Sequence, residues 1–242
     1  QNGTAEGALF GVPILIKDAQ RGKGKRTTFG LLLFLDAPVD SVSAPMVERL
    51  QDAGAIVLGR TTTPEFCISG VCRSNAWGNT VNPYNPAFGT GGSSGGSGAA
   101  LAAGFAPITT GTDIGGSIRI PSSCCDVVGF KPLHGRNPDG PPANFDRYNH
   151  CGPMARTIGD LSLVQNVVSG AHPKDHDSLR DLVTYPTIER NLSGSKIAFS
   201  LDLGYCTVHR EIKENTIKAL GVFRSTGAEI EEVSLPWTVN LD

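Results

Sequence analysis

The most informative stretch of the 242-residue chain runs from residue 89 to residue 117 and reads GTGGSSGGSGAALAAGFAPITTGTDIGGS. It holds two glycine clusters, GTGGSSGGSG (Gly89–Gly98) and GTDIGGS (Gly111–Ser117). Between the clusters, small residues predict a helix at Ala99–Ala103, and Pro107–Thr110 is expected to be extended. Each glycine cluster therefore lies beside a regular element, inside a folded domain.

The sequence before and after this stretch continues the alternation of helix and strand. APMVERLQDA (Ala44–Ala53) predicts a helix that Gly54 ends in the left-handed conformation, and AIVLG (Ala55–Gly59) predicts a buried strand. Thr157 and Asp160 resemble a capping box, which predicts the start of a helix that continues to Val168.

The C-terminal part predicts a βαβ unit. A strand at Lys196–Ser200, a helix at Thr207–Thr226 and an extended segment at Ala228–Leu235 follow one another, and such a unit implies a parallel strand pair. We therefore expect an α/β fold with a mixed β-sheet core flanked by helices. We expect residues 1–242 to form a single domain, with His172–Ser195 as a long surface connection inside it.

Composition narrows the classes of partner. The chain has 21 Lys plus Arg against 23 Asp plus Glu, so it lacks the excess of basic residues that attracts nucleic acid or anionic lipid. No apolar run approaches the roughly 18 to 20 residues of a membrane span. Six sparse cysteines, none in a C-x-x-C pair, favour reduced thiols over a disulfide scaffold. We expect a cytoplasmic protein without a nucleic-acid or membrane partner.

The first glycine cluster has several interpretations. A flexible linker is the simplest, but a Pro-rich turn before the cluster and a helix after it argue against one. The phosphate-binding patterns G-x-x-x-x-G-K-[ST] and G-x-G-x-x-G are both missing. The esterase pattern G-x-S-x-G occurs around Ser93 and again around Ser94, but a glycine-rich run often contains this pattern by chance. The esterase turn also follows a strand, whereas the preceding Asn82–Phe88 is turn-like.

Histidine chemistry is an open alternative. A Ser-His-Asp esterase would need one of three histidines, His172, His176 or His209. His172 and His176 are four residues apart, but the polar stretch HPKDHD around them predicts a solvated loop rather than a metal site. We expect no metal and no organic cofactor.

A lysine provides a better starting point. Lys17 ends the apolar run GALFGVPILIKD (Gly7–Asp18), so we expect its ammonium group to be partly desolvated and its pKa to be lowered, as a lysine base requires. Together with Ser93 and Ser117 in the two glycine clusters, it forms a candidate catalytic set.

Five ordered segments carry a family resemblance: GVPILIKD, GGSSGGSGAALAAG, GTDIGGSIRIPSS, VVGFKP and GPMARTIGD. In this order they closely resemble the amidase signature family, from about Gly7 to Pro236. Family members carry more sequence before the lysine and after the βαβ unit, so we expect N- and C-terminal parts of the domain to be missing here. Three departures, Thr63, Asp126 and Leu133, leave the catalytic positions untouched.

The resemblance implies a Ser-cisSer-Lys triad of Ser117, Ser93 and Lys17, with a cis peptide bond between Gly92 and Ser93. Ser117 is the expected nucleophile, and its proton would pass through Ser93 to neutral Lys17. The expected oxyanion donors are the backbone amides of Ile114, Gly115, Gly116 and Ser117. Supporting hydrogen bonds are expected from four further residues: Ser94, Thr112, Asp113 and Arg119.

The implied function is hydrolysis of a small-molecule carboxylic amide through an acyl-enzyme. The A subunit of an aminoacyl-tRNA amidotransferase, which works as a glutaminase, and a noncatalytic fragment or scaffold remain alternatives. A homodimer also stays open. His134–His150 is a candidate rim of the substrate pocket.

Overall fold

The computed structural model describes residues 7–186 and 191–237. By their internal contacts, residues 1–187 and 188–242 form two compact units. The single domain expected over residues 1–242 stays a prediction.

The first unit is built on a five-stranded sheet with the order β2-β1-β5-β7-β6. Its strands are β1 (Pro13–Lys17), β2 (Ile56–Thr61), β5 (Ile108–Asp113), β6 (Val128–Gly129) and β7 (His150–Ala155). Strand β1 pairs in parallel with β2 and β5, whereas β7 pairs antiparallel with β5 and β6. The mixed sheet confirms the predicted fold class.

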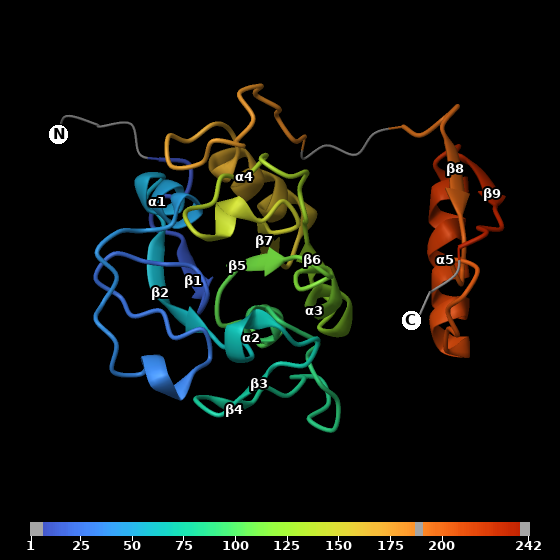
Figure 1. Cartoon of the computed structure of the whole chain (residues 1–242). Coiled ribbons are helices and arrows are strands. Elements are labelled where there is room, and N and C mark those ends of the chain that lie inside the picture. The colour runs from blue at the N-terminus through green and yellow to red at the C-terminus, as the bar shows by residue number, and fades with distance from the viewer. Residues whose placement is uncertain (1–6, 187–190, 238–242) are drawn as a thin grey trace. The chain divides into compact units, whose positions relative to one another are not determined.

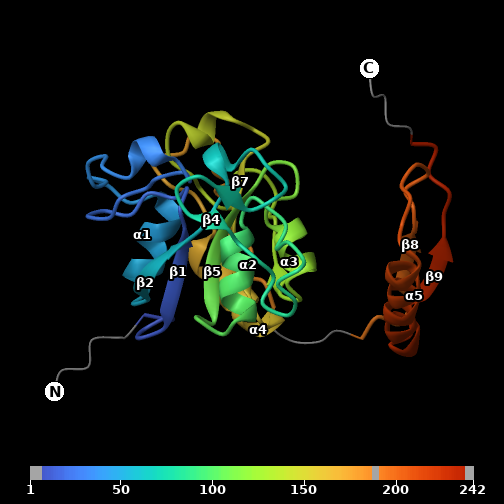
Figure 2. The same ribbon diagram turned by 90° about the horizontal axis from the view of Figure 1, so that it is seen from below.

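Helices cover both faces of this sheet (Figures 1 and 2). Helices α1 (Pro45–Asp52) and α4 (Ile158–Val168) pack on one face, and α2 (Gly95–Ala102) and α3 (Arg119–Cys124) pack on the other. The main apolar core lies between the sheet and the first helix pair, where Ile14 and Ile16 of β1 meet Leu50 of α1 and Val164 of α4. Lys17 is the last residue of β1.

Smaller elements complete the first unit. They are the 3-10 turns η1 (Leu32–Phe34), η2 (Glu65–Cys67) and η3 (Ala143–Phe145), and the antiparallel pair β3 (Arg73–Ser74) and β4 (Gly78–Asn79).

The structure confirms most predicted elements and corrects two. Helix α4 begins after Thr157, whose Oγ1 accepts a hydrogen bond of 3.1 Å from the amide of Asp160. Helix α2 begins at Gly95, four residues before the predicted start. Close packing outweighs the low helix propensity of glycine there, because a Cβ at Gly96 would lie 2.4 Å from the backbone nitrogen of Thr62.

The second correction concerns β2. The sequence predicts a buried strand, but β2 lies at an edge of the sheet, where Ile56 is 52% and Leu58 is 59% exposed. An apolar run is typical of a strand, but it does not tell an edge from a centre.

The second unit contains β8 (Lys196–Phe199), α5 (Arg210–Ser225) and β9 (Glu229–Glu232). The two strands pair in parallel, with Lys196 opposite Glu229, which confirms the predicted βαβ unit. No helix in the described part of either unit is long and apolar enough to cross a membrane.

Candidate active site

Lys17 is a fully buried lysine at the end of β1. Its Nζ donates hydrogen bonds to Ser93 Oγ at 2.6 Å and to Thr112 Oγ1 at 2.7 Å. Burial lowers the pKa of Lys17 below its ordinary value, and the neighbouring Cys67, Cys72 and Asp113 oppose that shift without reversing it. The pKa is thus shifted in the direction expected from the apolar run, and the neutral amine is accessible at lower pH than in an ordinary lysine.

Ser93 is held in a tight turn before α2. The Gly92–Ser93 peptide bond is cis, as the resemblance implies. Glycine is required at position 92, because a Cβ there would lie 2.6 Å from the carbonyl oxygen of Ser69. Only 1% of Ser93 is exposed, so its hydroxyl reaches Lys17 away from bulk solvent.

A buried carboxylate shapes the loop that carries Ser117. Asp113 Oδ1 accepts the amide of Gly116 at 2.8 Å, and Oδ2 accepts the amide of Ile118 at 3.0 Å. The guanidinium of Arg119 donates to both oxygens, at 2.8 and 3.0 Å. Burial alone would raise the pKa of Asp113, but the hydrogen bonds from Arg119 and the loop amides outweigh it and lower the pKa to about 2. Asp113 stays charged and fixes the loop.

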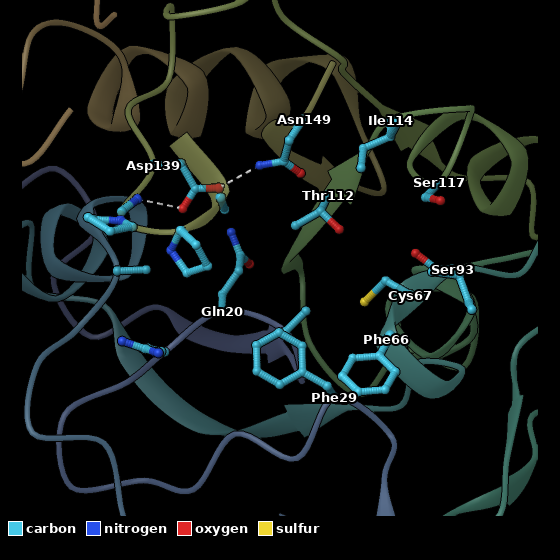
Figure 3. A pocket seen from close by; sticks show the side chains of 18 of the residues that line it. Gln20, Phe29, Phe66, Cys67, Ser93, Thr112, Ile114, Ser117, Asp139 and Asn149 are labelled. Atoms are coloured by element: carbon cyan, nitrogen blue, oxygen red, sulfur yellow. Dashed lines mark hydrogen bonds between the residues drawn. The ribbon is translucent and has the colours of Figure 1, made fainter. Parts of the chain in front are cut away.

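Ser94 joins the two serine-bearing loops. Its amide donates to the carbonyl oxygen of Ser117 at 3.1 Å. Its Oγ lies 3.3 Å from both the carbonyl oxygen and the amide nitrogen of Thr112. Ser93 and Ser117 consequently line the same cavity, and Figure 3 shows their hydroxyls at one end of it. The four residues predicted to support the site all make hydrogen bonds that shape it.

The amides proposed as oxyanion donors fall into two groups. That of Gly116 already donates to Asp113. Within residues 7–186, the amides of Ile114, Gly115 and Ser117 donate to no protein acceptor, and all three residues line the cavity. These three backbone N–H groups are therefore free for a ligand oxygen.

The cavity has a volume of about 850 Å³. Much of its wall is apolar and includes Phe29, Phe66, Ile114 and Ile120. Both phenylalanines have a φ of 51°, a left-handed conformation that is unfavourable for bulky residues, and the amide of Phe66 donates to the carbonyl oxygen of Phe29. The fold thus holds two aromatic residues in a costly conformation at the pocket.

The predicted rim and several residues that sequence reasoning missed also line the cavity. Residues 139–143 and Asn149 come from the stretch His134–His150, which confirms that stretch as part of the wall. Gln20, Phe29, Phe66 and Cys67 were missed. No periodicity or motif in the sequence marks them, because they come from loops and a short 3-10 turn between strands.

Two histidines of the esterase alternative lie away from the serines within the first unit. His172 Nε2 is 3.7 Å from Glu48, and His176 is exposed beside Asp177. Neither of them lines the cavity with Ser93 and Ser117. His209 directly precedes α5 in the second unit, so an esterase that uses His209 stays an open alternative. Among the described residues no group of three His, Cys, Asp or Glu side chains is arranged to hold a metal ion.

Comparison with known proteins tests the resemblance. The Amidase family model matches residues 1–241. The chain belongs to the amidase signature family. This member is 39% identical over 233 residues to the A subunit of glutamyl-tRNA(Gln) amidotransferase from Brachyspira hyodysenteriae, an alignment that covers 94% of the chain and 48% of that protein.

Solved structures of family members are similar as well. A bacterial aryl acylamidase belonging to the amidase signature enzymes matches with a TM-score of 0.89 and 35% identity, over 96% of this chain and 49% of the other. The A subunit of glutamyl-tRNA(Gln) amidotransferase from Thermotoga maritima matches with a TM-score of 0.87 and 29% identity, over 98% and 53%. The chain spans about half the length of the curated relatives it matches.

Proposed function

We propose that the chain hydrolyses the C–N bond of a small-molecule carboxylic amide through an acyl-enzyme on Ser117. The observation that carries the proposal is the 2.6 Å hydrogen bond between buried Lys17 and Ser93, in a cavity that Ser93 and Ser117 both line. A lysine sealed from water and held by neutral hydroxyls is costly as an ammonium ion, so its neutral form is favoured as a base.

The first half of the reaction would form the acyl-enzyme. Neutral Nζ of Lys17 carries two protons and a lone pair, so it can donate to Thr112 Oγ1 while it accepts the proton of Ser93 Oγ. Ser93 in turn takes the proton of Ser117 as Ser117 Oγ attacks the amide carbonyl. The same relay returns a proton to the leaving nitrogen, so that ammonia or an amine departs.

The second half would regenerate the enzyme. Water attacks the acyl-enzyme and passes a proton through Ser93 to Lys17. The relay then returns this proton to Ser117 Oγ as the bond to the acyl group breaks, which releases the carboxylic acid. In both halves the free amides of Ile114, Gly115 and Ser117 would stabilise the oxyanion, and removal of such a donor typically costs about 3 to 4 kcal/mol. No step of this scheme needs a cofactor or a histidine.

The experiment is an assay of ammonia or amine release from aliphatic, aromatic and peptide amides. We expect turnover by the chain and none by a Ser117→Ala variant that keeps the same circular dichroism spectrum. Equal turnover by both proteins would reject the proposed nucleophile.

A second candidate is the glutaminase component of an aminoacyl-tRNA amidotransferase. Its support is the identity to curated A subunits, such as 39% to that of Brachyspira hyodysenteriae. Preferential release of ammonia from glutamine, together with co-purification in a stable complex with partner subunits, would favour this candidate over a free-standing amidase.

The remaining expectations keep the status of predictions. A homodimer and a cytoplasmic location are among them. The noncatalytic scaffold would be favoured if the folded chain failed to react with serine-directed probes.

A further inference from the structure

One carboxylate in the cavity takes no part in the proposed relay. Asp139 lines the cavity, and Figure 3 shows it with Asn149 and Gln20 on the side away from Ser93 and Ser117. Asp139 Oδ1 accepts the amide of Gly140 at 2.8 Å, and Oδ2 accepts Nδ2 of Asn149 at 2.9 Å. A carboxylate has about four acceptor positions, so two such bonds leave it able to accept more.

Among the described residues, 7–186 and 191–237, no cation forms an ion pair with this carboxylate. The charged group that affects its pKa is another acid, Asp175. Asp175 Oδ2 accepts a hydrogen bond from the amide of Asp139 at 3.0 Å. Lys174, which also lines the cavity, points its Nζ to Glu48 Oε2 at 2.9 Å. Asp139 is half-buried, and a partly desolvated carboxylate without a counter-charge is unfavourable unless a ligand supplies one.

A second acceptor in the same cavity is unsatisfied. Gln20 is only 3% exposed, and within the described part of the chain its Oε1 has no hydrogen-bond partner. Its Nε2 donates to the sulfur of Met46, at 3.5 Å. Buried side-chain acceptors are rarely left unpaired. Gln20 lines the cavity, so a small rotation of its amide would bring this unpaired oxygen to a donor that arrives with the ligand.

We propose that Asp139 and Gln20 form a subsite for a positively charged hydrogen-bond donor, so that the preferred substrates are amides bearing an ammonium group at the end away from the scissile bond. This inference rests on the proposed function, because it names the substrate class of the same cavity. Between the two polar ends, the apolar wall that includes Phe29 and Phe66 would contact the connecting part of the substrate.

The charge state of Asp139 supports the subsite and limits its pH range. Burial raises the pKa of Asp139 to about 6, the bonds from Gly140 and Asn149 act against that shift, and the charge of Asp175 adds to it. The other titratable groups around it are Lys174 and Arg21 on the cavity wall, Cys151 in β7, whose thiol burial keeps neutral, and His134, His150 and Asp175, which line an adjoining small cavity with Asp139. The carboxylate is therefore charged above about pH 6 and neutral well below it.

The test measures binding, so that it is independent of turnover. The Ser117→Ala chain is titrated calorimetrically at pH 8 with ω-aminoalkanamides of four to eight carbons. Each is compared with the alkanamide in which a methyl group replaces the ammonium group. The same titrations are made with Asp139→Asn and Gln20→Met added, and with Asp36→Asn as a control for an exposed carboxylate.

We expect the best ω-amino amide to bind about 10- to 100-fold more tightly than its methyl counterpart, the range for a hydrogen bond to a charged group. Asp139→Asn should reduce this preference to within about twofold, Gln20→Met should reduce it partly, and Asp36→Asn should leave it unchanged. At pH 5 the preference should shrink, since Asp139 is then mostly protonated.

Three results would overturn the subsite: equal binding of both amides, a preference that survives Asp139→Asn, or no binding of either amide. Tighter binding of ω-carboxy amides would assign the end of the pocket to Arg21 and Lys174 instead. Failure of the proposed function is a separate outcome: a preference that depends on Asp139, combined with no hydrolysis of any amide by the unsubstituted chain, would keep the subsite and reject the amidase.

Discussion

Replacement of Lys17 by Met removes the proposed base while nearly keeping the volume of a fully buried side chain. The substitution deletes the hydrogen bonds of 2.6 Å to Ser93 and 2.7 Å to Thr112. A positioned general base contributes about 10²- to 10⁴-fold to a rate, so kcat should fall by that factor, which is about 3 to 5 kcal/mol in the barrier. Lys25→Met, at an exposed lysine, is the matched control and should keep the full rate.

The pH dependence of the same site has a definite sign. Because burial lowers the pKa of Lys17, kcat/KM should rise with pH through this depressed lysine pKa. The free energy of unfolding should also rise with pH between the depressed pKa and the ordinary value of 10.5, since the unfolded chain binds more protons in that window. Lys17→Met should abolish this contribution.

Initial rates from pH 5 to 10 and urea unfolding at the same pH values give both readouts. A Lys17→Met chain that keeps the rate and pH profile of the unsubstituted chain would refute the lysine relay.

Three further expectations concern the neighbouring groups. Ser93→Ala should reduce kcat less than Ser117→Ala, because water can replace a relay hydroxyl but not the nucleophile; single-turnover rates would show this, and the reverse order would contradict it. Replacement of each histidine of the esterase alternative (His172, His176 and His209) by alanine should change kcat by less than roughly tenfold, which is about 1.4 kcal/mol in the activation barrier. An inactive variant at one of these positions would support the esterase alternative. Asp139→Asn should raise the free energy of unfolding at pH 8 by about 1 to 2 kcal/mol and change it little near pH 4. The reason is that folding raises the pKa of this carboxyl from 3.8 to about 6, so the charged form destabilises the folded state only at the higher pH. Urea titrations that show equal gains at both pH values would exclude this explanation.

Several residues of the candidate site were predictable because they lie in ordered motifs. Lys17 at the end of an apolar run predicted a buried amine with a lowered pKa, and the structure has both. The capped start of α4 and the parallel βαβ unit followed from local patterns. In each case the determining interaction is between residues close in sequence, or the motif itself fixes the backbone.

Other features depend on contacts that no local pattern encodes. Gly95 and Gly96 are helical because the backbone of Thr62 and the side chain of Cys72 pack against them. The exposure of Leu58 depends on which strand forms the edge of the sheet. Gln20 and Asp139 meet in one cavity although 119 positions separate them in the sequence, so the subsite could be found only from the structure.

Covalent labelling tests the central claim most directly. The folded chain is treated with a fluorophosphonate, digested and mapped by mass spectrometry, with Ser117→Ala and Lys17→Met treated in parallel. The account predicts a single adduct on Ser117, none in Ser117→Ala, and strongly slowed labelling in Lys17→Met, because the nucleophile then lacks its base. An adduct on Ser94 with Ser117 unmodified, or labelling of Ser117 at an unchanged rate in Lys17→Met, would contradict it.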